Sequence, residues 1–211
     1  MPEEGIPLIP HKEILTYEEL LRIVRIFAEE GISKVRLTGG EPLVRKGIVD
    51  FIARLSGIQE IQDLSLTTNG ILLKEYAQGL KKAGLKRVNI SLDSLNKETF
   101  CQITRRDDFE KVWAGIEETI RVGLSPIKIN MVAIQGLNDA EIESFARLTF
   151  RLPITVRYIE YMPSGNGKEW RESDLLTIPQ IKNHLERVGN LVPIPMDRWD
   201  GPAKRFRFEG A

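Results

Sequence analysis

Apolar residues along this chain occur in two alternating arrangements, one typical of strands and one typical of helices. Short segments rich in Val, Ile and Leu run into glycine, asparagine or other polar residues, which predicts strands followed by turns, over residues 34–38, 64–70, 88–93, 127–134 and 155–161. Between these segments, apolar residues recur every three or four positions. This spacing predicts amphipathic helices over residues 16–30, 47–56, 72–83 and 96–122, and after residues 138 and 177.

Several residues mark the ends of these helices. Capping boxes, in which a threonine is followed three positions later by Glu or Gln, are predicted at Thr16–Glu19 and Thr177–Gln180. Asn138 and Asp139 are expected to cap the helix that follows them. The long helical stretch is expected to break near residues 105–107.

Strands that are separated by helices indicate right-handed βα units and a parallel sheet or barrel. Because we find no linker or low-complexity tract, we expect residues 1–211 to form a single domain. Ligands of such folds bind at the carboxyl ends of the strands. The turns that follow the predicted strands are therefore the places to look for a site.

Charge and cysteine content exclude several classes of protein. Thirty basic and thirty acidic residues cancel, so the chain lacks the overall positive charge of most nucleic-acid or anionic-membrane binders. No apolar run reaches the ~18 residues of a membrane span. We therefore expect a cytoplasmic protein with no nucleic-acid or membrane partner. Cys101 is the single cysteine, which excludes an intrachain disulfide and a metal site of clustered cysteines.

Four cations interrupt the predicted strands, where buried positions are normally apolar: Lys34, Arg36, Lys128 and Arg157. A cation inside such a fold needs a partner. For any one of them, an ion pair with Glu41 or Glu160 is an equal alternative. As a set with few acidic residues nearby, they favour a polyanionic ligand such as a nucleoside triphosphate.

The first strand runs into Gly39 and Gly40, where a ligand can approach bare backbone. The turn Thr38-Gly39-Gly40-Glu41-Pro42 resembles the signature turn of radical S-adenosylmethionine (SAM) enzymes. Three later segments, in the same order, resemble GTP 3',8-cyclases of molybdenum cofactor biosynthesis in particular: residues 67–70, 89–93 and 157–162. The resemblance extends over the whole chain.

The resemblance implies a parallel (β/α) TIM-like barrel and two ligands. SAM would lie against Gly39, Gly40, Glu41, Ser91 and Met162. GTP would lie against Lys34, Arg36, Thr67, Lys128 and Arg157. The reaction implied is cleavage of SAM to a 5'-deoxyadenosyl radical, which abstracts the ribose 3'-hydrogen of GTP before the sugar carbon attacks C8 of guanine. No catalytic side chain is assigned by the resemblance.

The chain departs from this family in its cysteines. The family binds two [4Fe–4S] clusters, one through a Cys-x3-Cys-x2-Cys motif placed directly before the segment that is Met1-Pro2 here, and one through cysteines beyond the basic, aromatic segment 204–208. A four-iron cluster normally needs three or four thiolates, and Cys101 alone supplies neither set. We therefore expect a truncated radical SAM core without its first strand or its C-terminal cluster region, inactive by itself.

This expectation leaves several alternatives open. The strand around Val35 would be an unpaired edge, to be covered by complementary chain segments or in a homodimer. The protein could be another radical SAM enzyme, or a non-catalytic nucleotide- or SAM-binding module. Asp93 and Glu160 are candidate general bases, although carboxylates at strand ends more often hold loops in place. The segment 204–208 fits a half-buried strand better than an RNA-binding strip.

Overall fold

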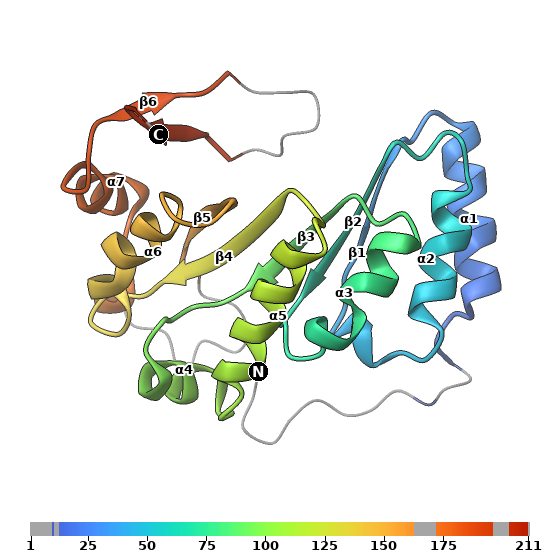
Figure 1. Ribbon diagram of the computed structural model, residues 1–211, viewed down its shortest axis with the longest axis horizontal. Coiled ribbons are helices and arrows are strands. Elements are labelled where there is room, and N and C mark those ends of the chain that lie inside the picture. Colours follow the sequence, from blue (N-terminus) through green and yellow to red (C-terminus); the bar gives the residue numbers. More distant parts are fainter. Residues whose placement is uncertain (1–9, 11–12, 163–171, 196–202, 211) are drawn as a thin grey trace.

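The computed structural model describes residue 10 and residues 13–162, 172–195 and 203–210. Its main body alternates strands and helices (Figure 1). The strands are β1 Lys34–Leu37, β2 Asp63–Thr68, β3 Arg87–Ser91, β4 Ile127–Ala133, β5 Ile154–Glu160, β6 Leu191–Pro193 and β7 Phe206–Phe208. The α-helices are α1 Tyr17–Glu29, α2 Ile48–Ser56, α3 Leu73–Lys82, α4 Lys97–Thr104, α5 Phe109–Arg121, α6 Ile142–Leu148 and α7 Ile178–Glu186. Short 3-10 helices are η2 Pro42–Val44, η3 Asp139–Glu141 and η4 Glu172–Asp174.

The first five strands form one parallel sheet in the order β1-β2-β3-β4-β5. This confirms the predicted parallel arrangement, and each strand lies within two residues of its predicted bounds. Within the described part of the chain the sheet is open, with β1 and β5 at its edges. The expected edge at the Val35 strand is therefore present here.

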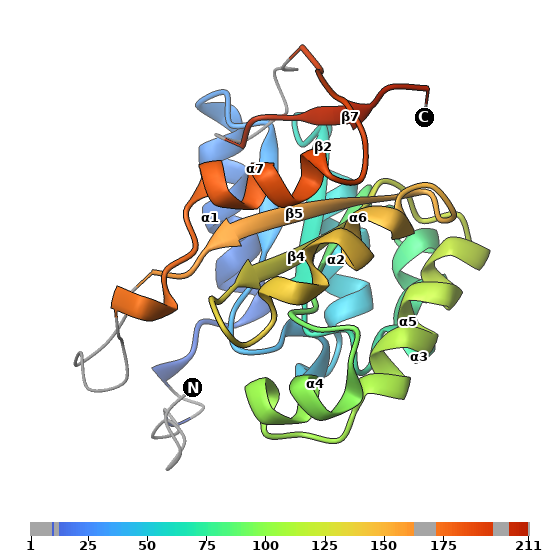
Figure 2. The ribbon, with the colours of Figure 1, turned by 90° about the vertical axis from the view of Figure 1, so that its left-hand side faces the viewer.

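Strand alternation divides the sheet into an apolar face and a polar face. The apolar face includes Leu66, Ile90 and Ile129, which are fully buried. It packs against α2, α3 and α5, which lie together on one side of the sheet (Figures 1 and 2). Burying this surface is the main favourable contribution to folding, and it leaves the opposite face of the strands for polar side chains.

Predicted caps and breaks were mostly confirmed. The Thr16 amide donates to Glu19 Oε2 at 2.7 Å and the Thr177 amide donates to Gln180 Oε1 at 2.9 Å. The long helical stretch breaks after α4, where Arg105 has a left-handed φ of 59°. The tail strand is present as β7, which pairs antiparallel with β6. No helix among the described residues is long and apolar enough to cross a membrane.

Asn138 occupies the N-cap position of η3, as predicted, but its side chain makes no capping hydrogen bond. Its buried side chain accepts the Ile134 amide at 2.8 Å and donates to the carbonyls of Asp93, at 2.7 Å, and Val132, at 2.9 Å. It therefore joins the loop after β3 to the end of β4. Sequence spacing did not reveal this, because an asparagine before a helix has the same local pattern in both roles.

Candidate functional site on the polar face of the sheet

Residues from all five strands meet in rows on the polar face, because partners in a parallel ladder point to the same side. One row contains Arg36, Ser65 and Arg87. The next contains Thr67, Asn89, Lys128 and Thr155, and the third contains Ser91, Asn130 and Arg157. Six of the residues predicted to contact ligands are brought onto one surface in this way: Lys34, Arg36, Thr67, Ser91, Lys128 and Arg157.

The polar face gathers positively charged side chains. Its strand residues include five cations, namely Lys34, Arg36, Arg87, Lys128 and Arg157, against one carboxylate, Asp63, within the described strands. Lys128 and Arg157 are half-buried and Arg36 is exposed. Partial burial strengthens electrostatic attraction by reducing solvent screening. This face therefore suits an anionic ligand, although the chain as a whole has no net charge.

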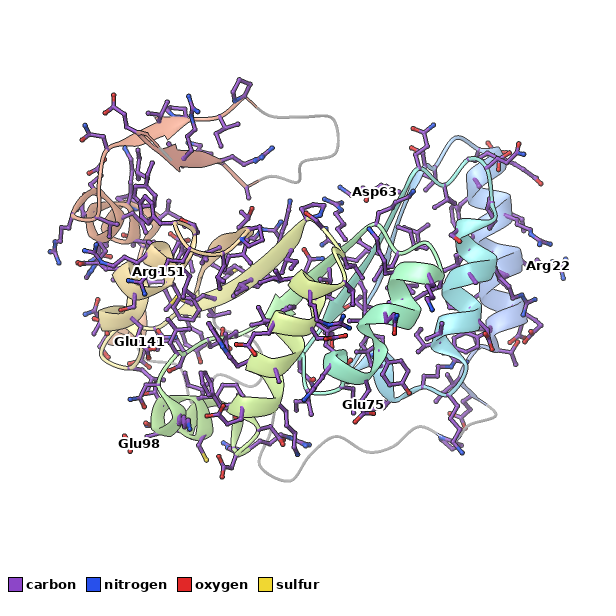
Figure 3. The ribbon with its side chains drawn as sticks, in the orientation of Figure 1. Arg22, Asp63, Glu75, Glu98, Glu141 and Arg151 are labelled. Carbon is purple, nitrogen blue, oxygen red and sulfur yellow. The ribbon has the colours of Figure 1, made fainter. Side chains whose placement is uncertain are left out.

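A buried ion pair lies at the amino end of the face. The Arg87 Nε donates to Asp63 Oδ1 at 2.9 Å, and its Nη2 donates to Asp63 Oδ2. The Lys34 Nζ lies 4.0 Å from the same Oδ2. Figure 3 shows Asp63 at the opposite end of the molecule from Glu75 and Glu98, which follow the carboxyl ends of β2 and β3. Lys34 thus approaches Asp63, an acid that was not weighed from sequence.

At the carboxyl end of β1, the glycine turn is open to solvent. Gly39 and Gly40 are exposed, and a Cβ built on either would have no protein atom within 4 Å. Gly39 has a φ of 156°, a value that residues with a side chain rarely adopt. The backbone of this turn is therefore accessible to a ligand.

Glu41 holds this turn against the end of β2. Its Oε1 accepts the Leu43 amide at 3.0 Å and the Thr68 hydroxyl at 2.8 Å. Its Oε2 accepts the Asn69 amide at 2.7 Å. Three donors from two segments thus converge on one carboxylate, which fixes the glycine turn relative to the neighbouring strand.

The turn after β2 requires its polar residues and its glycine. The Thr68 Oγ1 accepts the Gly70 amide at 3.0 Å, and the Asn69 Oδ1 accepts the Ile71 amide at 3.0 Å. Gly70 has a φ of 83°, and a Cβ there would lie 3.0 Å from Val112. The segment 67–70 is therefore a compact turn that α5 covers closely.

The two candidate bases hold loops in place. Asp93 Oδ1 accepts the Val132 amide at 2.8 Å, and Glu160 Oε1 accepts the Ile178 amide at 2.5 Å. Burial raises the pKa of Asp93, and the Val132 hydrogen bond partly opposes this effect. These contacts favour the loop-fixing interpretation over general-base catalysis.

Other predicted ligand contacts lie at the carboxyl ends of the central and last strands. Ser91 is exposed at the end of β3 and pairs in register with Asn130. The Arg157 Nη1 lies 3.4 Å from Asn130 Oδ1. Met162 follows β5 by two residues and is 71% exposed. Asn130 therefore lies next to both Ser91, a predicted SAM contact, and Arg157, a predicted GTP contact.

Sequence reasoning missed several residues of the polar face, among them Asp63, Arg87 and Asn89. Asn89 is almost fully buried, and its amide donates to the Leu66 carbonyl at 3.2 Å and to Thr67 Oγ1 at 3.4 Å. The missed residues alternate with apolar neighbours in β2 and β3. The alternation of polar and apolar residues along these two strands was therefore the signal that could have identified them.

The residues present do not fit a [4Fe–4S] cluster. Cys101 is exposed on α4. Among the described residues, no three His, Cys, Asp or Glu side chains are arranged to hold a metal ion. A cluster bound by three or four thiolates cannot be built from the one thiol in these 211 residues.

Comparison with known proteins identifies a family. Residues 4–149 match the model of the radical SAM superfamily. The chain is 50% identical over its whole length to a GTP 3',8-cyclase of Alkaliphilus metalliredigens, and 51% identical to one of Alkaliphilus oremlandii, also over all of this chain. It covers 65% and 64% of these two relatives, slightly less than two thirds of their length.

Solved structures share the fold at low sequence identity. A radical SAM methyltransferase from Sphaerobacter thermophilus superposes with a TM-score of 0.63 at 20% identity, covering 82% of this chain and 55% of that one. Coproporphyrinogen III oxidase from Escherichia coli superposes with a TM-score of 0.55 at 20% identity, covering 81% of this chain and 43% of that one. Since the family model matches more than half of the chain, the chain belongs to the radical SAM superfamily.

Proposed function

We propose that this chain is the GTP- and SAM-binding part of a GTP 3',8-cyclase. The observation that carries the proposal is the polar face, where strand register brings Arg36, Lys128 and Arg157 from three strands onto one surface. Arginine and lysine side chains are the groups that bind phosphate oxygens in proteins. Relatives named GTP 3',8-cyclase, about half identical over the whole chain, support the same substrate.

The proposed GTP residues are those that the resemblance implies, and they lie in rows on the polar face. Arg36, Lys128 and Arg157 would neutralise the phosphates from three different strands, with Lys34 toward the amino end. The hydroxyl of Thr67 would add a polar contact beside Lys128. Spreading the cations over several strands holds the ligand in one orientation, because each strand is fixed by the sheet.

SAM would lie at the carboxyl ends, against the exposed turn of Gly39 and Gly40 and near Ser91 and Met162. Backbone groups and a hydroxyl suit the zwitterionic methionine part of SAM. Glu41, whose carboxylate already accepts three protein donors, would serve SAM by shaping this turn. The reaction proposed for the whole protein uses SAM as a radical source to join C3' of the ribose to C8 of guanine.

GTP binding tests the proposal through the central cations. Arg36→Ala and Lys128→Ala are each expected to weaken GTP binding by roughly tenfold, the value of one charge-assisted contact. Isothermal titration calorimetry on the purified chain would measure this, with guanosine to show how much of the loss depends on the phosphates. Arg22→Ala, which removes an exposed cation from the outer helix α1 at the edge of the molecule (Figure 3), is the matched control. Equal GTP affinities in all four proteins would contradict the proposal.

SAM binding tests the glycine turn separately. Gly40→Ala is expected to leave the unfolding midpoint unchanged, because the added Cβ meets no protein atom within 4 Å. It is expected to weaken SAM binding at least about tenfold, since the methyl group would occupy the space through which SAM reaches the backbone. Calorimetric titration with SAM measures this, and an unchanged GTP affinity is the internal control. Undiminished SAM affinity would show that SAM does not lie against this turn.

A second candidate is a module that binds both ligands without catalysis. The poor fit of these residues to an iron–sulfur cluster favours it for the 211 residues by themselves. After anaerobic reconstitution with iron and sulfide, the chain is expected to contain no stoichiometric cluster and to release no 5'-deoxyadenosine from SAM. Iron analysis and chromatography of the nucleosides check this. Cluster-dependent release of 5'-deoxyadenosine would rule out a purely binding role.

A further inference from the structure

The strand β3 ends at Ser91 and then separates from β4. The Leu92 amide still donates to the Asn130 carbonyl, at 3.0 Å. Two residues further along β4, the Val132 amide donates to the side chain of Asp93, at 2.8 Å, instead of to the backbone of β3. Because the ladder between the two strands ends here, the position of the Ser91 side chain depends on the contacts that hold the loop after it.

The carboxylate of Glu141, at the end of η3, holds this loop. Its Oε1 accepts the hydroxyl of the buried Ser94 at 2.6 Å. Its Oε2 accepts the Leu95 amide at 2.6 Å and the Asn96 amide at 3.1 Å. Hydrogen bonds to an ionised acceptor are roughly twice as strong as those between neutral groups. Figure 3 shows Glu141 between α4 and α6, so it joins the loop before α4 to the segment before α6.

Asn138 holds the same loop from the same short segment. Its side-chain amide donates to the Asp93 carbonyl at 2.7 Å and to the Val132 carbonyl at 2.9 Å, so it spans the place where β3 and β4 separate. Asn138 and Glu141 are three residues apart, and in a 3-10 turn this spacing puts two side chains on the same side. The segment 138–141 therefore fixes the loop after β3 at two points.

We propose that Glu141 is a positioning residue for SAM, with Asn138 as its partner. By fixing the loop after β3, Glu141 holds Ser91 in the orientation that meets the ligand. This proposal rests on the proposed function, in which SAM lies near Ser91. A site that is ordered before binding has a higher affinity, because binding then carries no entropic cost of ordering the loop.

Two other roles for Glu141 give different results. A purely structural residue that holds α4 in place would affect stability without distinguishing between ligands. A negative charge that attracts the sulfonium cation of SAM would be lost in any neutral replacement. A positioning residue affects SAM more than GTP, because Lys128 pairs in register with Asn89, where β3 and β4 are still joined.

Two substitutions of Glu141 separate these roles. Glu141→Ala removes all three contacts with the loop. Glu141→Gln keeps the contacts without the charge, because its amide oxygen can accept from Leu95 and Asn96. Its NH2 group can donate to Ser94 Oγ, whose own proton can turn to the Asn96 carbonyl, 3.0 Å away.

Leu85→Ala is the matched control for stability. Leu85 is buried in the hydrophobic core two residues before β3, at the opposite end of the same strand. Its replacement leaves a cavity and lowers stability without touching the loop after β3.

The purified chain and its variants would be titrated calorimetrically with SAM and GTP, and urea unfolding would give their stability. Glu141→Ala is expected to weaken SAM binding roughly tenfold and to keep GTP affinity within about twofold. Glu141→Gln is expected to retain SAM affinity. Leu85→Ala is expected to lower the urea midpoint with both affinities unchanged. Should Glu141→Ala not fold, Ser94→Ala removes a single contact and is expected to weaken SAM binding about threefold.

Wild-type SAM affinity in Glu141→Ala, or in Ser94→Ala where it takes its place, would overturn the positioning role while leaving SAM binding intact. Equal losses of SAM and GTP affinity, or a similar loss of SAM affinity in Leu85→Ala, would make Glu141 a structural residue only. SAM binding by Glu141→Gln as weak as that of Glu141→Ala would assign the effect to charge instead. A wild-type chain that binds no SAM would refute the proposed function and this proposal together.

Discussion

Glu41→Ala is expected to lower the free energy of unfolding by about 3 kcal/mol and to reduce SAM affinity at least as strongly as Gly40→Ala does. The physical reason is the loss of three hydrogen bonds to one charged acceptor, from Leu43, Thr68 and Asn69, each worth about 1–2 kcal/mol before relaxation and solvation reduce the total. Urea denaturation gives the stability, and calorimetric titration gives the affinity for SAM.

Glu41→Gln is the matched control for charge and shape. Its amide oxygen can still accept from Leu43 and Thr68, but its NH2 group would face the Asn69 amide, donor against donor. We therefore expect a loss of about 1–2 kcal/mol, intermediate between the wild type and Glu41→Ala. If Glu41→Ala unfolded at the wild-type urea midpoint, Glu41 would not hold the turn, and a direct contact with SAM would become the better explanation of its place in the motif.

Gly115→Ala is expected to destabilise the fold by about 3 kcal/mol, at the upper end of the usual cost of overpacking. Gly115 lies in α5, and a Cβ there would be 2.7 Å from the Gly70 carbonyl oxygen and 3.0 Å from Leu73 Cβ. These atoms belong to the turn after β2 and to the start of α3, so α5 would have to move away from both. Thermal unfolding is expected to shift down by roughly 6–12 °C.

Gly79→Ala provides a matched control in the neighbouring helix α3. A Cβ at Gly79 would make only ordinary 3.6 Å contacts with Val49. The added methyl group should therefore stabilise the helix by about 0.5–1 kcal/mol, because alanine has less backbone freedom in the unfolded chain. If both substitutions changed the stability in the same direction, helix propensity rather than close packing would decide the effect at Gly115.

Most of the fold could be predicted because it depends on local periodicity. The strands and helices follow from apolar spacing, and a parallel sheet follows from their alternation. The break near Arg105 and the capping box at Thr16 have equally local signals. The side-chain contacts of Asn138 were not predicted, because its partners Asp93 and Val132 lie in other segments of the chain.

The candidate site was predicted in part. Its cations were visible because charge is rare inside a strand. Asp63 and Arg87 were missed because their ion pair joins residues 24 positions apart, and only strand register brings them together. The function of Glu41 also depends on register, since its carboxylate holds the turn that follows a different strand.

The sequence by itself determined which segments form strands, where the glycine turn lies, and which strand positions carry charge. Those features depend on side-chain pattern and backbone freedom over a few neighbouring residues. Only the tertiary structure decided that the charges share one face, that Lys34 adjoins Asp63, and that Arg87 pairs with Asp63. Pairing β1, β2 and β3 side by side sets these distances, because register places residues far apart in the chain within a few ångströms of one another.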